Sequence, residues 1–189
     1  MKIIETELSG VLAIELDRYS DSRGSFVESW HKEKYVSLGL GVDFVQDNIS
    51  YSKKGVLRGL HYQNPSPQGK LVFVLEGGIF DVAVDIRLGS PTFGKWFGMT
   101  LTYENCKQLY IPEGFAHGFV VTSEVATFAY KCTGYYNKES EKTIRWDDPE
   151  IGIVWPIENP ILSEKDRVGS SLKEMPREGL FTFDRKPLE

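Results

Sequence analysis

Residues 70–87, KLVFVLEGGIFDVAVDIR, are the part of the sequence most informative about the fold class. Two runs rich in β-branched and other apolar residues flank Glu76-Gly77-Gly78, and this arrangement predicts two strands joined as a hairpin. Side chains alternate across a strand, so the second run presents two faces. One face carries Ile79, Asp81, Ala83 and Asp85, and the other carries Phe80, Val82, Val84 and Ile86.

Similar runs recur along the chain about every 8 to 12 residues, with turn residues between them. This spacing favours an all-β sandwich or barrel over an α/β fold. Residues 1–30 predict two strands around a loop at 19–26, and residues 30–41 predict a short helix. The segment after Pro156 predicts loop and short helix. With 189 residues, the chain is expected to form a single domain spanning 1–189.

The composition is that of an ordinary globular protein, with 41% hydrophobic and 26% charged residues. The net charge of −5 argues against a nucleic-acid-binding surface. No stretch approaches the roughly 18 apolar residues of a membrane span, and MKIIETELSG lacks the features of a signal peptide, so we expect a cytoplasmic protein. Cys106 and Cys132 form no spaced motif and are expected to be reduced core thiols.

A second informative stretch is IPEGFAHGF, residues 111–119. Its Pro112, Gly114 and His117 match the P-x-G-x-x-H of the second cupin motif, and cupins are small double-sheet jelly rolls. We therefore expect an all-β, cupin-like double-stranded β-helix (jelly roll) with short peripheral helices.

The histidines indicate a pocket without metal. Cupin enzymes usually hold a metal through two neighbouring histidines, a glutamate and the later histidine, but here the first pair is reduced to His61 in LHYQ. His31 falls in the predicted surface helix. His61 and His117, with no obvious carboxylate, make a poor metal site, so we expect neither metal nor cofactor. A histidine in such a pocket can instead act as a general base.

The stretch VLRGLHYQ, residues 56–63, poses a geometric problem, because Arg58 and His61 interrupt an apolar strand. In a regular strand these two side chains point to opposite faces. Gly59 between them is a candidate for a β-bulge that turns both into one cavity.

Several phrases, taken together and in order, resemble the dTDP-4-dehydrorhamnose 3,5-epimerase family. They are DSRGSFVESW, FVQDNIS, GVLRGLHYQ, QGKLVFVLEGGIFDVAVDIR, GSPTFGKW, IPEGFAHGF, YKCTGYY and LSEKD. The resemblance runs from about residue 10 to residue 168. It implies a nucleotide-sugar substrate, dTDP-4-dehydro-6-deoxy-D-glucose, whose C4 ketone acidifies the protons at C3 and C5. The enzyme would remove each proton and return one on the opposite face, giving dTDP-4-dehydro-L-rhamnose for dTDP-L-rhamnose biosynthesis.

The resemblance also implies catalytic roles. His61 resembles the family's base, and Asp166 resembles the carboxylate that fixes the tautomer of that base. Tyr130 resembles the general acid, since a phenol with a pKa near ~10 holds its proton at neutral pH. Lys70 resembles the residue that faces the C4 oxygen, where an ammonium would stabilise the enolate.

Further residues resemble the family's substrate contacts. Arg23 and Arg58 suit a pyrophosphate, because a guanidinium forks onto phosphate oxygens. The resemblance assigns nucleoside contacts to Phe26, Glu28, Gln46 and Asn48, and other substrate contacts to His117, Glu141 and Lys165. Tyr136, six residues after Tyr130, is expected to supply a related pocket contact. Glu139, in the same stretch NKESEK, is the alternative assignment to Glu141. The resemblance finally implies a homodimer, in which the N-terminal segment reaches the partner's barrel and Phe26 and Glu28 complete the neighbouring site.

Three alternatives to the double epimerase stay open. One is a C3-only or C5-only epimerase of another 4-keto nucleotide sugar, which needs the same base and acid. Another is a non-catalytic cupin that binds a sugar nucleotide, although a binder has no need of an acid that faces a base. The third is a metal-dependent cupin oxygenase or isomerase, which the missing ligands disfavour.

Overall fold

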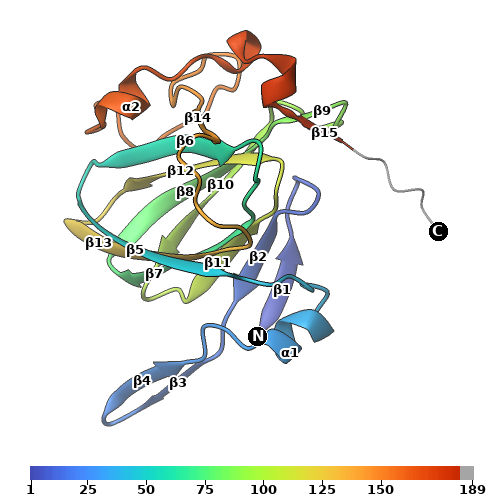
Figure 1. Ribbon diagram of the computed structural model, residues 1–189. Helices are drawn as coiled ribbons and strands as arrows, with labels where there is room; N and C mark the ends of the chain where they lie inside the picture. Colours follow the sequence, from blue (N-terminus) through green and yellow to red (C-terminus); the bar gives the residue numbers. More distant parts are fainter. Residues whose placement is uncertain (184–189) are drawn as a thin grey trace.

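Two antiparallel sheets face each other in the computed structural model, which describes residues 1–183 (Figure 1). The larger sheet has the order β1 (Lys2–Glu5), β2 (Leu12–Glu15), β11 (Lys107–Ile111), β7 (Lys70–Glu76), β13 (Val125–Cys132) and β5 (Gln46–Lys53). The smaller sheet has the order β10 (Trp96–Thr102), β8 (Gly78–Asp85), β12 (Phe115–Val121), β6 (Leu57–Gln63) and β14 (Glu141–Thr143). The predicted all-β double-sheet fold is confirmed.

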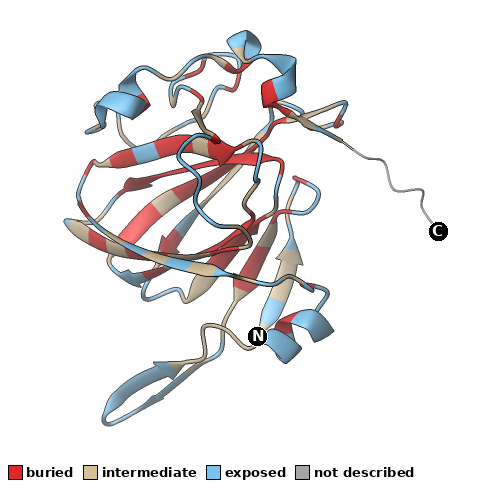
Figure 2. Cartoon of the chain, in the orientation of Figure 1, coloured by how far each residue is buried: buried red, intermediate tan, exposed pale blue. Residues whose placement is uncertain are grey.

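The two faces of β8 line two separate cores, as the alternation of its residues predicts. Ile79 and Ala83 belong to the core between the sheets, which also contains Val72 and Phe128. Val82 and its neighbours on the other face pack under the C-terminal segment, together with Ile151, Leu172 and Leu180. Figure 2 shows the buried strands of the barrel and the largely exposed segments around them. The smaller sheet is therefore covered on both sides.

The predicted hairpin at Glu76-Gly77-Gly78 is wrong. β7 pairs with β11 and β13, whereas β8 pairs with β10 and β12, so the two strands lie in different sheets. Gly77 has φ +73°, and a Cβ there would lie 2.0 Å from the carbonyl oxygen of Val125. The glycines thus make a tight corner that carries the chain from one sheet to the other. A turn signal predicts that the chain reverses, but the pairing partners depend on the strands that close the barrel later in the sequence.

The short peripheral elements agree with the sequence. Helix α1 (Lys32–Ser37) lies in the predicted N-terminal helical segment, and α2 (Glu164–Arg167) lies in the C-terminal one. The remaining short elements are the 3-10 turns Leu172–Glu174 and Arg177–Gly179 and the parallel pair β9 (Arg87–Leu88) and β15 (Phe181–Thr182). Within residues 1–183, no helix is long and apolar enough to cross a membrane.

The N-terminal hairpin of β3 (Arg18–Asp21) and β4 (Gly24–Val27) projects away from the barrel (Figure 1). Its residues are mostly exposed (Figure 2). Phe26 is 66% exposed and lies opposite Tyr19 in the ladder, so the hairpin presents an aromatic pair to its surroundings.

Strand β6 contains the bulge that Arg58 and His61 require. His61 pairs with His117 and Arg58 pairs with Phe119, so two residues of β6, Gly59 and Leu60, oppose the single Gly118 of β12. Gly59 has φ +136°, and a Cβ there would lie 2.5 Å from the Cα of Gly118. The extra residue reverses the alternation, and Arg58 and His61 line the same cavity. The interpretation of Gly59 as a bulge is confirmed.

We predict that Gly59→Ala lowers the free energy of unfolding by about 3 kcal/mol, because the methyl group overpacks a backbone contact. Gly24→Ala is the matched control: Gly24 has φ +131°, but a methyl group there would meet no described atom within 4 Å, so only backbone strain of about 1 kcal/mol is expected. Urea unfolding of both variants measures the difference. Equal losses in the two variants would contradict the close approach of β6 and β12.

Candidate active site

Two adjoining cavities open between the sheets, with volumes of about 240 and 320 Å³. They share five lining residues, namely His61, Lys70, Tyr130, Tyr136 and Glu141. Edge strand β5 contributes polar residues to their walls: Gln46 and Asn48 line the first cavity and Ser50 the second. The residues between them, such as Ile49, are exposed on the outer face of the sheet. The alternation of β5 is therefore inverted relative to an ordinary core strand, which indicates a site for a polar molecule.

His61 forms a pair with Asp166. The Nε2 atom of His61 lies 2.5 Å from Oδ1 of Asp166, which is only 3% exposed. Burial acts to raise the pKa of Asp166, but the hydrogen bonds of His61 and Ser163 prevail and hold that pKa below its ordinary value. Asp166 is thus a carboxylate that fixes the orientation of the ring and leaves its other nitrogen for chemistry. In the sequence Asp166 resembles a surface charge, and its burial comes from the C-terminal segment that covers the barrel.

Ser163 supports this pair and was not identified from the sequence. It is the N-cap of α2, its hydroxyl donates to Oδ2 of Asp166 at 2.7 Å, and it accepts from the backbone N–H of Asp166 at 3.3 Å. A serine three residues before a helical aspartate is a recognisable capping signal. Helix α2 is thereby held so that Asp166 faces His61.

His117 also has a carboxylate partner, Asp81, and the expectation that the two histidines lack carboxylates is wrong. Nε2 of His117 lies 2.9 Å from Oδ2 of Asp81, and both residues are buried. The ring of His117 stacks against Phe128 at 6.2 Å. The alternation of the strand predicts the face on which Asp81 lies, but its role was missed. The signal was present, because a charge on an apolar inner face needs a partner.

Lys70 lies on the first position of β7 and is 9% exposed, so it is not a solvated turn lysine. Burial lowers the pKa of its ammonium, against the opposing effect of Cys132, Asp81 and Glu141. Burial raises the pKa of Asp81, against the effect of His117 and Lys70. The cation lies in the same cavity as His61, so it is available to stabilise a negative charge that forms there.

Tyr130 reaches the cavity from β13, in the sheet opposite the one that carries His61. Burial raises the pKa of its phenol, so the hydroxyl retains its proton at neutral pH. Tyr130 and His61 therefore bring an acid and a base to one cavity from its two walls, and Lys70 lines that cavity with them.

The outer wall of the site combines Tyr136, Glu141 and Lys165. Lys165 donates to Oε1 of Glu141 at 2.7 Å, and the Tyr136 hydroxyl donates to Oε2 at 3.3 Å. Burial acts to raise the pKa of Glu141, but Lys165 prevails and lowers it. Glu141, and not Glu139, lines the cavities. Nearby, Arg58 donates to Oγ of Ser52 through Nε and Nη2, at 3.2 and 3.1 Å.

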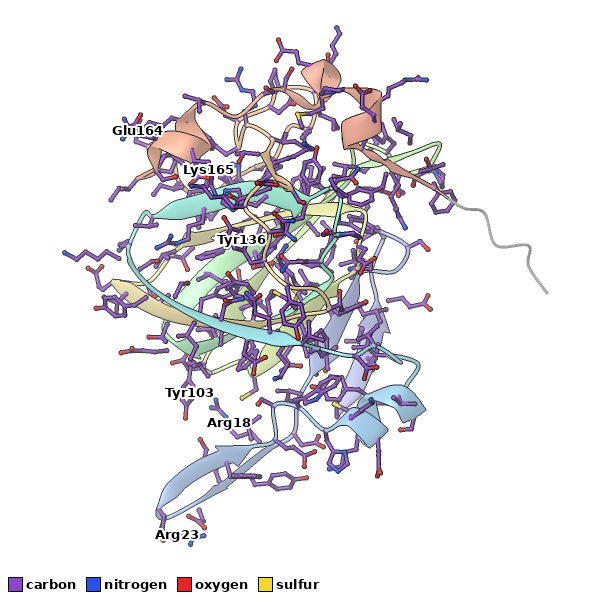
Figure 3. The ribbon with its side chains drawn as sticks, in the orientation of Figure 1. Arg18, Arg23, Tyr103, Tyr136, Glu164 and Lys165 are labelled. Atoms are coloured by element: carbon purple, nitrogen blue, oxygen red, sulfur yellow. The ribbon has the colours of Figure 1, made fainter. Side chains whose placement is uncertain are left out.

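Three predicted substrate contacts, Arg23, Phe26 and Glu28, do not line these cavities. Arg23 lies at the tip of the N-terminal hairpin, far from Tyr136 and Lys165 in Figure 3, and its side chain is 87% exposed. It pairs with Asp21, while Glu28 pairs with Lys34. Within one chain the structure therefore does not bring these residues to the site.

Among residues 1–183, no three His, Cys, Asp or Glu side chains gather so that they could hold a metal ion together. Each histidine of the cavity is instead joined to one aspartate.

Comparison with known proteins places these observations in a family. A model described as dTDP-4-dehydrorhamnose 3,5-epimerase matches residues 5–174. The dTDP-4-dehydrorhamnose 3,5-epimerase of Shigella flexneri is 54% identical over 168 residues, which cover 88% of this chain and 93% of that protein.

Two crystal structures extend the comparison. The dTDP-6-deoxy-D-glucose-3,5-epimerase of Legionella pneumophila Philadelphia 1, in complex with dTDP-4-keto-L-rhamnose, is 53% identical with a TM-score of 0.94. The match covers 97% of this chain and 98% of that chain. ChmJ, a 3'-monoepimerase from Streptomyces bikiniensis in complex with dTDP-quinovose, is 32% identical with a TM-score of 0.87, over 94% of this chain and 91% of that one.

The burial of Lys70 predicts a cost in stability. Because its pKa is lowered on folding, the ammonium destabilises the folded state at neutral pH. We predict that Lys70→Met raises the free energy of unfolding at pH 7, because the buried ammonium is removed. The gain should be full below the folded-state pKa and should shrink as the pH rises towards the ordinary value of 10.5.

Urea unfolding between pH 7 and pH 10 measures this gain. Lys54→Met is the control, because Lys54 forms an exposed pair with Glu124 and its removal should change stability little. A loss of stability in Lys70→Met would mean that the ammonium is held by favourable contacts that outweigh its burial.

Proposed function

The chain belongs to the dTDP-4-dehydrorhamnose 3,5-epimerase family, and we propose that it inverts C3 and C5 of dTDP-4-dehydro-6-deoxy-D-glucose to give dTDP-4-dehydro-L-rhamnose. One observation carries the mechanism: His61 and Tyr130 line one cavity from opposite sheets. A sugar ring between them meets a base on one face and an acid on the other, which is the arrangement that inversion of a carbon centre requires.

The reaction begins at a carbon next to the C4 ketone. His61, oriented by Asp166, takes the proton from C3, and the electron pair of the C–H bond moves into an enolate whose charge rests on the C4 oxygen. Lys70 stabilises that oxygen. Tyr130 then donates its proton to C3 from the opposite face, and the ketone re-forms. After His61 and Tyr130 exchange protons with water, the same sequence at C5 gives the second inversion.

Charge supports a diphosphate-bearing substrate. The chain carries a net charge of −5, which repels anions at long range, so the pocket must concentrate positive potential locally. Arg58, Lys70 and Lys165 all line the larger cavity. Gln46 and Asn48, joined by a 3.0 Å hydrogen bond, provide polar groups for the nucleoside at the smaller cavity. We further propose that the enzyme acts in the cytoplasm.

The exposed hairpin supports a homodimer with exchanged arms. Its aromatic face lies open, and the ion pair that Arg23 forms within residues 1–183 is with Asp21 of its own hairpin. We propose that a second copy places Arg23, Phe26 and Glu28 at the neighbouring pocket. Arg23 would then face the pyrophosphate, and Phe26 would stack on the base.

A second candidate is a mono-epimerase, which the likeness to ChmJ favours over a non-catalytic binder or a metal-dependent cupin. Double and single epimerisation need the same base and acid. The two reactions are distinguished by which carbons of the product are inverted.

We predict that His61→Asn lowers the rate of solvent deuterium incorporation at C3 and C5 by about 10²–10⁴-fold, because no other described group replaces the oriented base. Proton NMR in deuterated water measures the exchange, and the circular dichroism spectrum checks the fold. Exchange at the wild-type rate would contradict the assignment.

Tyr130→Phe tests the acid separately, since it removes only a hydroxyl group. Because His61 remains, we expect proton exchange to persist at one carbon while the doubly inverted product is lost. Formation of that product at the wild-type rate would show that another group donates the proton.

Exchanged arms predict complementation between inactive subunits. Co-expressed His61→Asn and Phe26→Ala chains should form mixed dimers with one intact site, in which the Phe26 arm of the first chain completes the pocket of the second. Activity should return to about a quarter of the wild-type value under random pairing. The control pair, His61→Asn with Tyr130→Phe, should show no recovery, because both residues belong to one barrel. An absence of recovery in the first pair as well would contradict the exchange.

A further inference from the structure

The loop that joins β13 to β14, residues 133–140, carries Tyr136 and has no regular secondary structure. Tyr136 lines both cavities, yet it is 53% exposed, so apolar packing does not hold its ring in place. Its own side chain makes one long hydrogen bond, to Glu141. The backbone of the loop must therefore set the position of Tyr136 in the outer wall of the site.

Gln63 holds that backbone on both sides of Tyr136. Its Nε2 donates to the carbonyl oxygens of Tyr135 at 3.2 Å and of Ser66 at 2.8 Å, and its Oε1 accepts from the N–H of Asn137 at 2.9 Å. Two carbonyls face the nitrogen and one N–H faces the oxygen, so only one orientation of the amide fits. Gln63 borders the smaller cavity but is 3% exposed, and its amide is turned to the loop, which makes each of these bonds costly to lose.

Two other glutamines complete the same arrangement. Oε1 of Gln46 accepts from the N–H of Tyr136 itself at 2.8 Å, and Nε2 of Gln68 donates to the carbonyl oxygen of Gly134 at 2.7 Å. The three amides come from β5, from β6 and from the turn before β7. Gln63 is central among them, because it lies two residues after His61 on the same strand.

We propose that Gln63 is a positioning residue for Tyr136, which fixes the ring as a wall of the nucleotide site without touching the nucleotide. This inference rests on the proposed function, since it takes the occupant to be a dTDP-linked sugar. A wall set in advance lowers the entropy lost on binding, so Gln63 acts on affinity. Strand β6 then carries the base His61 and, through Gln63, also fixes the ring of Tyr136, so the two side chains keep a constant position relative to each other.

Calorimetric titration with dTDP tests this role. We expect Gln63→Leu, which keeps the volume and removes the hydrogen bonds, to raise the Kd for dTDP about tenfold. In steady-state assays KM should rise by a similar factor, while kcat stays within about threefold. Because Gln63→Leu risks misfolding, Gln68→Ala serves as a second variant and should raise the Kd in the same direction by a smaller factor.

A double-mutant cycle with Tyr136→Ala distinguishes positioning from direct contact. If Gln63 acts through Tyr136, adding Gln63→Leu to Tyr136→Ala should change the Kd by less than about twofold. Additive effects would overturn the proposal, because Gln63 would then act on the nucleotide by itself. An unchanged Kd in both Gln63→Leu and Gln68→Ala, or a fall in kcat with KM unchanged, would overturn it too.

Asn64→Ala is the matched structural control. Asn64 is the next residue, and its amide donates to the carbonyl oxygen of Leu180 at 3.0 Å, in the C-terminal segment. Its loss should lower stability and leave the Kd for dTDP unchanged. Wild-type enzyme that binds no dTDP would refute the proposed function, whereas wild-type binding with unaffected variants would refute only the role of Gln63.

Discussion

The close approach of Gly59 to Gly118 is the constraint on which the site depends. Two strands of the smaller sheet meet there with no side chain between them, and one strand accommodates an extra residue. Without the bulge, Arg58 and His61 would point to opposite sides of the sheet, one into the barrel and one beneath the C-terminal segment. With it, the Arg58 guanidinium and the His61 imidazole line one cavity, where the proposed mechanism uses the first for the phosphates and the second as the base. The pair of glycines therefore serves the chemistry as much as the packing.

Around that strand, the barrel buries charge that a purely structural core would avoid. Burial and neighbouring partners shift the pKa values of Asp81, Lys70 and Asp166. Each carboxylate is matched to a histidine, which limits the cost of burial and fixes the ring that receives its hydrogen bond. Lys70 forms no ion pair within the described residues. Its ammonium lines the cavity beside His61 and Tyr130, and in the proposed mechanism it stabilises negative charge that develops only during the reaction.

The sequence predicts most strands, the peripheral helices and the two faces of β8 well, because each depends on local alternation and turn residues. The loop predicted at residues 19–26 is wrong, since β3 and β4 form a hairpin there. The sequence also predicts the bulge, because an extra residue at Gly59 allows the side chains of Arg58 and His61 to enter the same cavity. It fails where long-range pairing decides: Gly77 turns the chain between sheets instead of closing a hairpin, and the partner of His117 is an aspartate 36 residues away. Asp166 and Lys70 resemble solvated charges until the C-terminal segment and the opposite sheet bury them. Gln63 was missed because its contacts with Tyr135 and Asn137 cross the fold, whereas Ser163 carries a local capping signal whose importance appears only once its partner Asp166 is paired with His61.

The most direct test of the mechanism is the configuration and labelling of the product formed by the wild-type enzyme. Proton NMR of the reaction of dTDP-4-dehydro-6-deoxy-D-glucose in deuterated water reports both at once. Double epimerisation predicts deuterium at C3 and at C5, with both centres inverted to the L-rhamno configuration. A product labelled and inverted at only one carbon would contradict the double epimerisation and identify a mono-epimerase, and a substrate returned without deuterium would contradict the assignment of His61 and Tyr130 to proton transfer.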